Sequence, residues 1–260
     1  MTDAAVLSGD SAGSLVAEVA AHLRCASRVT VLTGAGVSVA SGVPMFRGPD
    51  GLWRRYRPED LATPEAFARD PRLVWEWYDW RRHRIAGCRP NAAHHVLAAW
   101  ATAFPSLTLV TQNVDGLHER AGSAGVLRLH GSIWDVRCAR GCPRGRAGRR
   151  DDSVPMPSLP PRCAHCGAPE RPGVVWFGEP LDREILGRAA EAAAESDVFL
   201  TVGTSAVVFP AAGLVLAAKR AGATTIEVNP DETPMAPFLD VKVRQPAESF
   251  LPLVEVALRA

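Results

Sequence analysis

The sequence has no apolar run long enough to span a membrane, and its start, Met-Thr-Asp-Ala-Ala, lacks the basic region and apolar core of an export signal. It also lacks a charge bias. Its 29 basic and 28 acidic residues leave a net charge of +1, so no global field favours nucleic acid or an anionic membrane surface. No internal repeat is present. We therefore expect a cytoplasmic protein, built as one large α/β domain or as one domain with a smaller insertion.

Cysteine is scarce and unevenly placed. Four of the six cysteines form two pairs, Cys138 with Cys142 and Cys163 with Cys166. In a large chain that is not exported, such pairs favour a metal site over a disulfide framework. Four thiolates suit a closed tetrahedral zinc site with no position left for water, so we expect one structural zinc ion. It would hold residues 138–173, which are rich in Arg, Pro and Gly and have no regular period; the alternative is four unligated cysteines.

A glycine turn follows the first strand-like segment. Val29 to Leu32 are typical of a strand, and Gly34 and Gly36 would let the backbone approach a ligand closely. Ser38 stands where a helix would begin. Because backbone amides and a helix N-terminus bind pyrophosphate, a nucleotide is the first hypothesis. The alternative is a tight strand-to-helix turn without a ligand.

Strand-like segments alternate with helix-like segments along the rest of the chain, which indicates a doubly wound parallel sheet with right-handed crossovers. In such a sheet the ligand crevice opens at the carboxyl ends of the strands. Polar residues or small loop residues follow the predicted strands at those ends: Gln112, Asn113 and Asp115, then His130, then Gly203, Thr204 and Ser205, and finally Asn229.

These residues also have structural interpretations. Asn113 and Asp115 suit a turn, a lone histidine is usually structural, and Gly-Thr-Ser is a common loop. No Ser or Cys nucleophile motif lies near His130, so its chemistry would be proton transfer or hydrogen bonding to a ligand hydroxyl. Asn229 stands where a simple dehydrogenase would carry an acid for the adenosine ribose, which disfavours that class of enzyme.

Tyr78 and Arg81 are three residues apart on a helix predicted after Pro71, so both side chains would project from one face. Together they could hold a carboxylate, in surroundings kept dry by neighbouring tryptophans. Spacing alone favours the other interpretation, an amphipathic helix with its aromatic stripe in the core and its arginines solvated.

Several motifs occur in one order: Gly34-Ala-Gly-Val-Ser-Val-Ala-Ser-Gly-Val-Pro44, Phe46-Arg47, Gln112-Asn-Val-Asp115, His130-Gly131, the two cysteine pairs, Phe177-Gly-Glu179 and Gly203-Thr-Ser205. This set resembles the sirtuins, which are NAD-dependent protein deacylases. The resemblance implies a Rossmann-like NAD-binding domain made of residues 1–47, 89–131 and 174–260. It also implies a small domain made of a helical module, residues 48–88, and a zinc-binding module, residues 132–173, with the acyl-lysine peptide bound between the two domains.

The resemblance further implies roles for single residues. The pyrophosphate side of NAD would contact Gly34, Ala35, Gly36 and Ser38. The adenosine side would contact Gly203, Thr204, Ser205 and Asn229, with Ala247 as a further cofactor contact. Nicotinamide and its ribose would lie at Gln112, Asn113 and Asp115, and the site would be covered by Phe46 and Arg47.

The family's mechanism makes His130 the general base. In that mechanism the acyl oxygen attacks C1′ of the ribose as nicotinamide leaves, which gives an alkylimidate. His130 would draw a proton from the ribose hydroxyls, a hydroxyl would then attack the imidate, and water would release free lysine and O-acyl-ADP-ribose. The substrate peptide would pair as an added strand with residues 175–179, through Val175, Phe177, Gly178 and Glu179.

Within the family, Ala62-Thr-Pro-Glu-Ala66 and Tyr78-Asp-Trp-Arg81 resemble the branch that removes succinyl, malonyl or glutaryl groups. Ala66 would leave room for the acyl group, Tyr78 and Arg81 would hold its carboxylate, and acetyl-lysine activity would persist alongside. The alternatives are a plain deacetylase, a protein ADP-ribosyltransferase of the same fold, and a non-catalytic NAD sensor whose zinc module binds a partner or DNA. Two departures from the family pattern are Met45 before Phe-Arg and the three residues inside the first cysteine pair.

Overall fold

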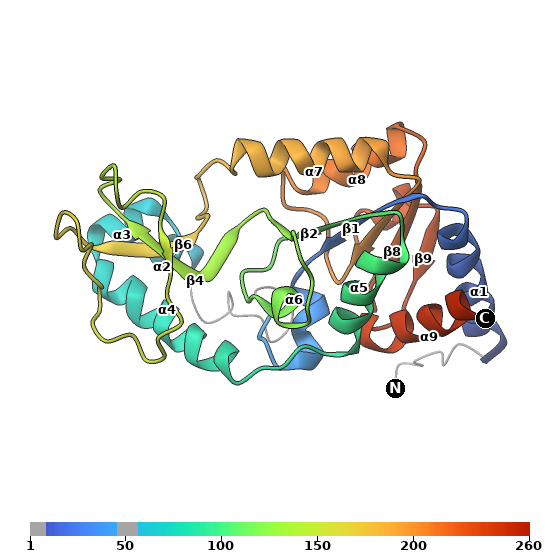
Figure 1. Ribbon diagram of the computed structural model, residues 1–260, viewed down its shortest axis with the longest axis horizontal. Helices are drawn as coiled ribbons and strands as arrows, with labels where there is room; N and C mark the ends of the chain where they lie inside the picture. Colours follow the sequence, from blue (N-terminus) through green and yellow to red (C-terminus); the bar gives the residue numbers. More distant parts are fainter. Residues whose placement is uncertain (1–8, 46–56) are drawn as a thin grey trace.

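The structure is a computed structural model that describes residues 9–45 and 57–260. Its larger sheet has six parallel strands in the order β3-β2-β1-β7-β8-β9 (Figure 1). This is the strand order of a Rossmann fold, and the order reverses between the central strands β1 and β7. The predicted fold class is confirmed. The strands are β1 Arg28–Thr33, β2 Ser106–Thr111, β3 Leu127–Arg128, β7 Val198–Val202, β8 Thr224–Val228 and β9 Val241–Val243.

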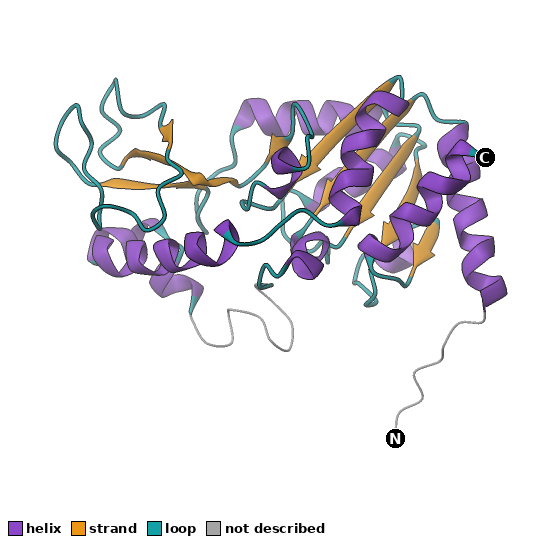
Figure 2. Cartoon of the chain, turned by 60° about the horizontal axis from the view of Figure 1, so that its bottom comes forward, coloured by secondary structure: helices purple, strands orange, loops and turns teal. Residues whose placement is uncertain are grey.

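Both faces of this sheet are covered by helices, because alternate strand residues are apolar on both sides. Val29 and Val31 of β1 pack into one cluster, and Leu32 packs into another. The first face carries α1 Gly9–Arg24, α5 Ala92–Ala103 and α9 Ala247–Arg259, and the second carries α7 Arg183–Glu195 and α8 Ala212–Arg220 (Figures 1 and 2).

A second, three-stranded antiparallel sheet has the order β5-β4-β6, with β4 Gly131–Cys138, β5 Arg149–Arg150 and β6 Glu170–Val174. It packs against three helices: α2 Pro58–Leu61, α3 Pro64–Arg69 and α4 Pro71–Ala86. One core holds both parts, including Trp75 and Tyr78 from α4 and Trp134 from β4. The sequence predicted no regular structure over residues 138–173. That prediction missed β5, which has only two residues, and β6, which contains Pro172 and Gly173.

Helix starts are set by local capping signals. The Thr63 and Asp70 side chains cap α3 and α4, each followed by a proline at the first helical position. Asn91 forms a capping box at the start of α5, and the Asp182 carboxylate accepts the first amides of α7. The helix predicted after Pro71 is therefore confirmed. None of the described helices is long and apolar enough to cross a membrane.

Candidate functional site

The glycine turn and the loop after β7 lock together at the point where the strand order reverses. The Gly36 amide donates to the Gly203 carbonyl at 2.8 Å, and the Gly34 amide donates to that of Val202 at 3.1 Å. A Cβ added to Gly34 would lie 2.6 Å from that of Thr204, and one added to Gly36 would lie 2.7 Å from the Gly203 Cα. These glycines thus make room for a neighbouring loop, and the predicted contact of Gly34 and Gly36 with a ligand stays a prediction.

The helix after this turn is a 3₁₀ helix, η1 Ala35–Ser41, so Ser38 lies within it and not at its start as predicted. The buried hydroxyl of Ser38 donates to the Asp115 carboxylate at 2.9 Å. The Asn113 side-chain amide donates to the Gly34 carbonyl at 3.0 Å and to the Ser38 hydroxyl at 3.2 Å. Burial raises the pKa of Asp115, against the opposing effect of hydrogen bonds from the Leu117 amide and Ser38. The structure therefore brings Ser38, Asn113 and Asp115 into one network.

Beneath this network lies a buried polar cluster that the sequence did not predict. The Thr33 hydroxyl lies 2.8 Å from that of Thr111 and 2.9 Å from Nε2 of His118. The centroids of the His118 and His94 rings lie 4.9 Å apart. Nε2 of His94 in turn lies 3.4 Å from the Ser38 hydroxyl. Burial lowers the pKa of His118 to about 3 and that of His94 to about 4, so both are neutral near pH 7. The sequence feature that could have indicated this cluster is that β1 and β2 both end in a threonine.

His130 follows β3 and is held by the carboxyl end of β2. Its Nδ1 lies 2.9 Å from the main-chain oxygen of Gln112, which can only accept, so Nδ1 carries a hydrogen and Nε2 is left as the basic atom. Burial lowers its pKa, although the bond to Gln112 opposes the shift. The Gln112 side-chain amide donates to the Thr204 hydroxyl at 2.9 Å. The ends of β2, β3 and β7 therefore meet here, as the sequence predicted.

The remaining cofactor candidates lie around the loop after β7. The Thr204 hydroxyl also accepts from the Ala206 amide, and the Thr204 carbonyl accepts from the Asn229 side chain at 3.2 Å. Ser205 is exposed. Ala247 begins α9 with its side chain in the core, so a ligand could reach only its backbone. Phe46 and Arg47 lie outside the described residues.

Tyr78 and Arg81 are both buried on α4, with exposed fractions of 3% and 6%. The Arg81 guanidinium lies 4.9 Å from the centroid of Trp77 and 5.8 Å from that of Tyr78. Burial lowers the pKa of Arg81, and the charges of Tyr78 and Asp115 oppose that shift. Ala66 is buried in the same cluster. The amphipathic-helix interpretation is therefore wrong about the solvation of Arg81, which is buried against the rings of Trp77 and Tyr78.

The predicted peptide-binding segment, residues 175–179, is already bonded within the chain. The Val175 amide donates to the His130 carbonyl and the Phe177 amide to that of Ala62, each at 3.0 Å. Glu179 accepts two hydrogen bonds from the Arg171 guanidinium, at 2.5 and 2.7 Å, and one from the Trp176 amide at 2.9 Å. The Glu179 carboxylate therefore serves to fix its own loop.

The four cysteine sulfurs meet as the sequence predicted, all within 4.8 Å of one another. Sγ of Cys138 lies 3.5 Å from that of Cys166, and Sγ of Cys142 lies 3.8 Å from that of Cys163. A zinc–sulfur bond of about 2.3 Å in a tetrahedral site places the sulfurs about 3.8 Å apart, so the cluster fits one zinc ion. The longer first pair does not prevent this geometry.

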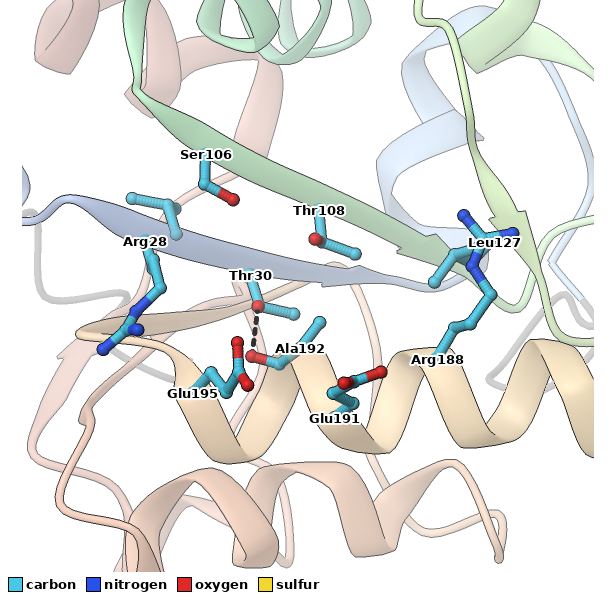
Figure 3. Close-up of a pocket in the computed structure, with 10 residues that line it drawn as sticks. Arg28, Thr30, Ser106, Thr108, Leu127, Arg188, Glu191, Ala192 and Glu195 are labelled. Atoms are coloured by element: carbon cyan, nitrogen blue, oxygen red, sulfur yellow. Dashed lines mark hydrogen bonds between the residues drawn. The ribbon is translucent and has the colours of Figure 1, made fainter.

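A cavity of about 220 Å³ lies away from these residues, between α7 and the sheet (Figure 3). Arg28 and Ser106, which begin β1 and β2, line it, and the Thr30 hydroxyl donates to the Ala192 carbonyl beside it. Since the candidate site lies at the opposite, carboxyl ends of the strands, we do not assign this cavity to it.

Known proteins resemble this chain over most of its length. A model of the Sir2 family matches residues 34–210. The NAD-dependent protein deacylase of Aquifex aeolicus (strain VF5) is 52% identical over 231 residues, covering 89% of this chain and 95% of that protein. A solved Sir2 homologue–NAD complex is 45% identical, with a TM-score of 0.84 over 93% of this chain and 94% of that one. A Sir2 variant solved with a deacetylated p53 peptide and 3′-O-acetyl ADP-ribose is 30% identical, with a TM-score of 0.82 over 92% and 97% of the two chains.

Proposed function

The chain belongs to the Sir2 family of NAD-dependent protein deacylases, and we propose that it removes succinyl and malonyl groups, as well as acetyl groups, from protein lysines. The observation that carries this proposal is the burial of Tyr78 and Arg81 on one face of α4. Tyr78 shares its core cluster with Ala66, and the Arg81 guanidinium lies 5.8 Å from the centroid of the Tyr78 ring. A phenol and a guanidinium on one helix face are suited to an acyl chain that ends in a carboxylate.

Burial makes this pair selective. A carboxylate that enters a site shielded from water loses hydration, and only a cation or a strong donor placed there offsets that cost. Arg81 supplies the cation and Tyr78 supplies a phenolic hydroxyl one turn away. An acetyl group ends in a methyl, so it gains no binding energy from Arg81 or Tyr78. Its removal would depend only on the catalytic chemistry that acetyl-lysine and succinyl-lysine share.

That shared chemistry would use the residues at the carboxyl ends of the strands. His130 would take a proton from a ribose hydroxyl at Nε2, because Nδ1 is held by the Gln112 carbonyl. The side-chain nitrogen of Asn113 donates to the Gly34 carbonyl and to the Ser38 hydroxyl, so the side-chain oxygen is left to accept a hydrogen bond from a ligand. Thr204 accepts two hydrogen bonds, which leaves its hydroxyl hydrogen for an acceptor on NAD.

The other NAD contacts would be Gly34, Ala35, Gly36, Ser38, Gln112, Asp115, Gly203, Ser205, Asn229 and Ala247. The peptide would lie along residues 175–179. Four of the five backbone amides of residues 175–179 donate within the chain. The peptide would therefore pair with the carbonyl oxygens of this segment and with the Gly178 amide. The division into domains and the cytoplasmic location remain predictions. The core shared by α2 to α4 and the second sheet supports the predicted small domain.

The proposal is tested with one peptide sequence carrying succinyl-lysine or acetyl-lysine. We would measure kcat/KM with NAD for the native protein and for Arg81→Met, which keeps an unbranched side chain but removes the guanidinium and its charge. A hydrogen bond to a charged group contributes about 1.5–3 kcal/mol, so the succinyl preference should fall about tenfold to 150-fold. Arg72→Met is the matched control, because Arg72 lies on the same helix with its side chain 76% exposed.

The control should keep the native ratio. Equal loss on both peptides in Arg81→Met, or no succinyl preference in the native protein, would leave a plain deacetylase. Nicotinamide release that depends on the acylated peptide separates either enzyme from a non-catalytic NAD sensor.

A further inference from the structure

Trp176 and Tyr78 form a hydrogen bond inside the core. The indole nitrogen of Trp176 lies 3.0 Å from the phenolic oxygen of Tyr78, and both residues are 3% exposed. An indole N–H can only donate, so the Tyr78 oxygen is the acceptor in this pair. No described residue accepts the hydrogen of the Tyr78 hydroxyl. That hydrogen is therefore available to an acceptor that is not part of the described chain.

The ring of Trp176 is held from two sides. The Arg171 guanidinium lies 3.5 Å from the ring centroid, and the Phe67 ring lies 5.3 Å away on a tilted plane. Glu179 holds Arg171 through two hydrogen bonds and also accepts from the backbone amide of Trp176. Both the backbone and the ring of Trp176 are therefore fixed, which fixes the direction of the indole N–H.

We propose that Trp176 is a positioning residue for acyl specificity: its indole N–H holds the Tyr78 hydroxyl as an acceptor, so that the phenolic hydrogen is presented to the carboxylate of an acidic acyl group. This inference rests on the proposed preference for acidic acyl groups. It assigns Glu179 and Arg171 a supporting part, since they hold the ring that orients Tyr78.

Removing the indole N–H leaves a buried phenol whose rotation is no longer fixed. The Tyr78 oxygen must then find another donor, and its hydrogen is no longer directed toward the acyl carboxylate. Because an ordinary hydrogen bond is lost and no charge is removed, the effect should be smaller than that of Arg81→Met.

The test compares Trp176→Phe with Trp75→Phe in the full chain. Trp75 is also fully buried in this core and donates its indole N–H to the Glu170 carbonyl at 2.7 Å, but it makes no hydrogen bond to Tyr78. Both variants thus lose the same ring volume and one hydrogen bond. We expect the succinyl-to-acetyl ratio of kcat/KM to fall about threefold to tenfold in Trp176→Phe and to stay native in Trp75→Phe.

A double-mutant cycle shows whether the effect passes through Tyr78. In a Tyr78→Phe background, Trp176→Phe should not change the ratio further. A further fall of the same size in that background, or an equal fall in Trp75→Phe, would overturn the inference. Should Trp176→Phe fail to fold, benzothienylalanine at position 176 keeps the ring shape without an N–H and should give the same fall.

The two proposals fail in different ways. A native protein without succinyl preference would overturn the proposed function, and this inference with it. A native preference that falls in Arg81→Met but is unchanged in Trp176→Phe would overturn this inference alone.

Discussion

Nδ1 of His130 and the main-chain oxygen of Gln112 lie 2.9 Å apart, which fixes the tautomer of the histidine and leaves Nε2 as its basic atom. We predict that His130→Ala abolishes lysine release, while NAD binding and exchange of labelled nicotinamide into NAD persist, because those steps come before the base acts. Both are measured with the acylated peptide present. His22→Ala, on α1, is the control, and undiminished lysine release in His130→Ala would remove His130 from this role.

The same histidine predicts a pH dependence. Burial lowers the pKa of His130 below its ordinary value of 6.5, so at pH 6.5 more than half of the histidine is in the neutral, basic form. We expect the acidic limb of kcat/KM to have its midpoint below pH 6.5, at the folded-state pKa. A pH profile from 5 to 8 checks this. An acidic limb with its midpoint at or above 6.5 would contradict it.

Gly203 has a positive φ of 58°, and a Cβ there would also collide with the backbone nitrogen of Val37. Gly203→Ala should therefore cost more than the roughly 1–3 kcal/mol of backbone strain alone, and it should weaken NAD binding. Gly222→Ala isolates the strain, because Gly222 has a φ of 95° but open space around it. Urea unfolding measures both variants; equal losses of stability would show that the loop after β7 can move aside.

Gly145 touches the cysteine cluster. A Cβ added there would lie 2.9 Å from Sγ of both Cys142 and Cys163, and 2.7 Å from the Cβ of Cys138. Gly145→Ala should spread the sulfurs and speed the release of zinc to a coloured chelator. Gly141→Ala is the comparison for backbone strain without a clash, because Gly141, between Cys138 and Cys142, has a positive φ of 66° and no atom near its Cβ position. Native zinc retention in Gly145→Ala would mean that the chain relaxes around the metal.

The buried pair His94 and His118 predicts loss of stability in acid. Both are neutral when folded, with pKa values of about 4 and about 3, and both return to about 6.5 when unfolded. The unfolded state therefore binds more protons below pH 6.5. Between pH 6.5 and its folded-state pKa of about 4 for His94 or about 3 for His118, each histidine should lower the free energy of unfolding by about 1.4 kcal/mol per pH unit.

Urea unfolding of the native protein and of His118→Gln between pH 7 and 5 measures this slope. The variant should show a shallower decline than the native protein. The same slope in both would exclude His118 as a contributor.

Much of the fold and site was determined by the sequence alone. Strand and helix segments, their caps and the paired cysteines are local signals, since each depends on residues a few positions apart. Because the carboxyl ends of parallel strands share one edge of a sheet, the sequence also predicted that His130 and residues 112–115 lie near the glycine turn. Spacing alone predicted that Tyr78 and Arg81 share a helix face, but it favoured a solvated Arg81.

What only the tertiary structure decided is what each of these residues touches. Gly36 faces Gly203, which lies 167 positions further along the chain, and no local pattern could show that its missing Cβ makes room for another loop. Arg81 is only 6% exposed, which the spacing of residues along α4 did not predict. Tyr78 is an acceptor because Trp176, 98 residues away, donates to it. Residue types and local periods fix the elements and the chemistry available, whereas burial and hydrogen-bond direction arise from contacts between distant segments.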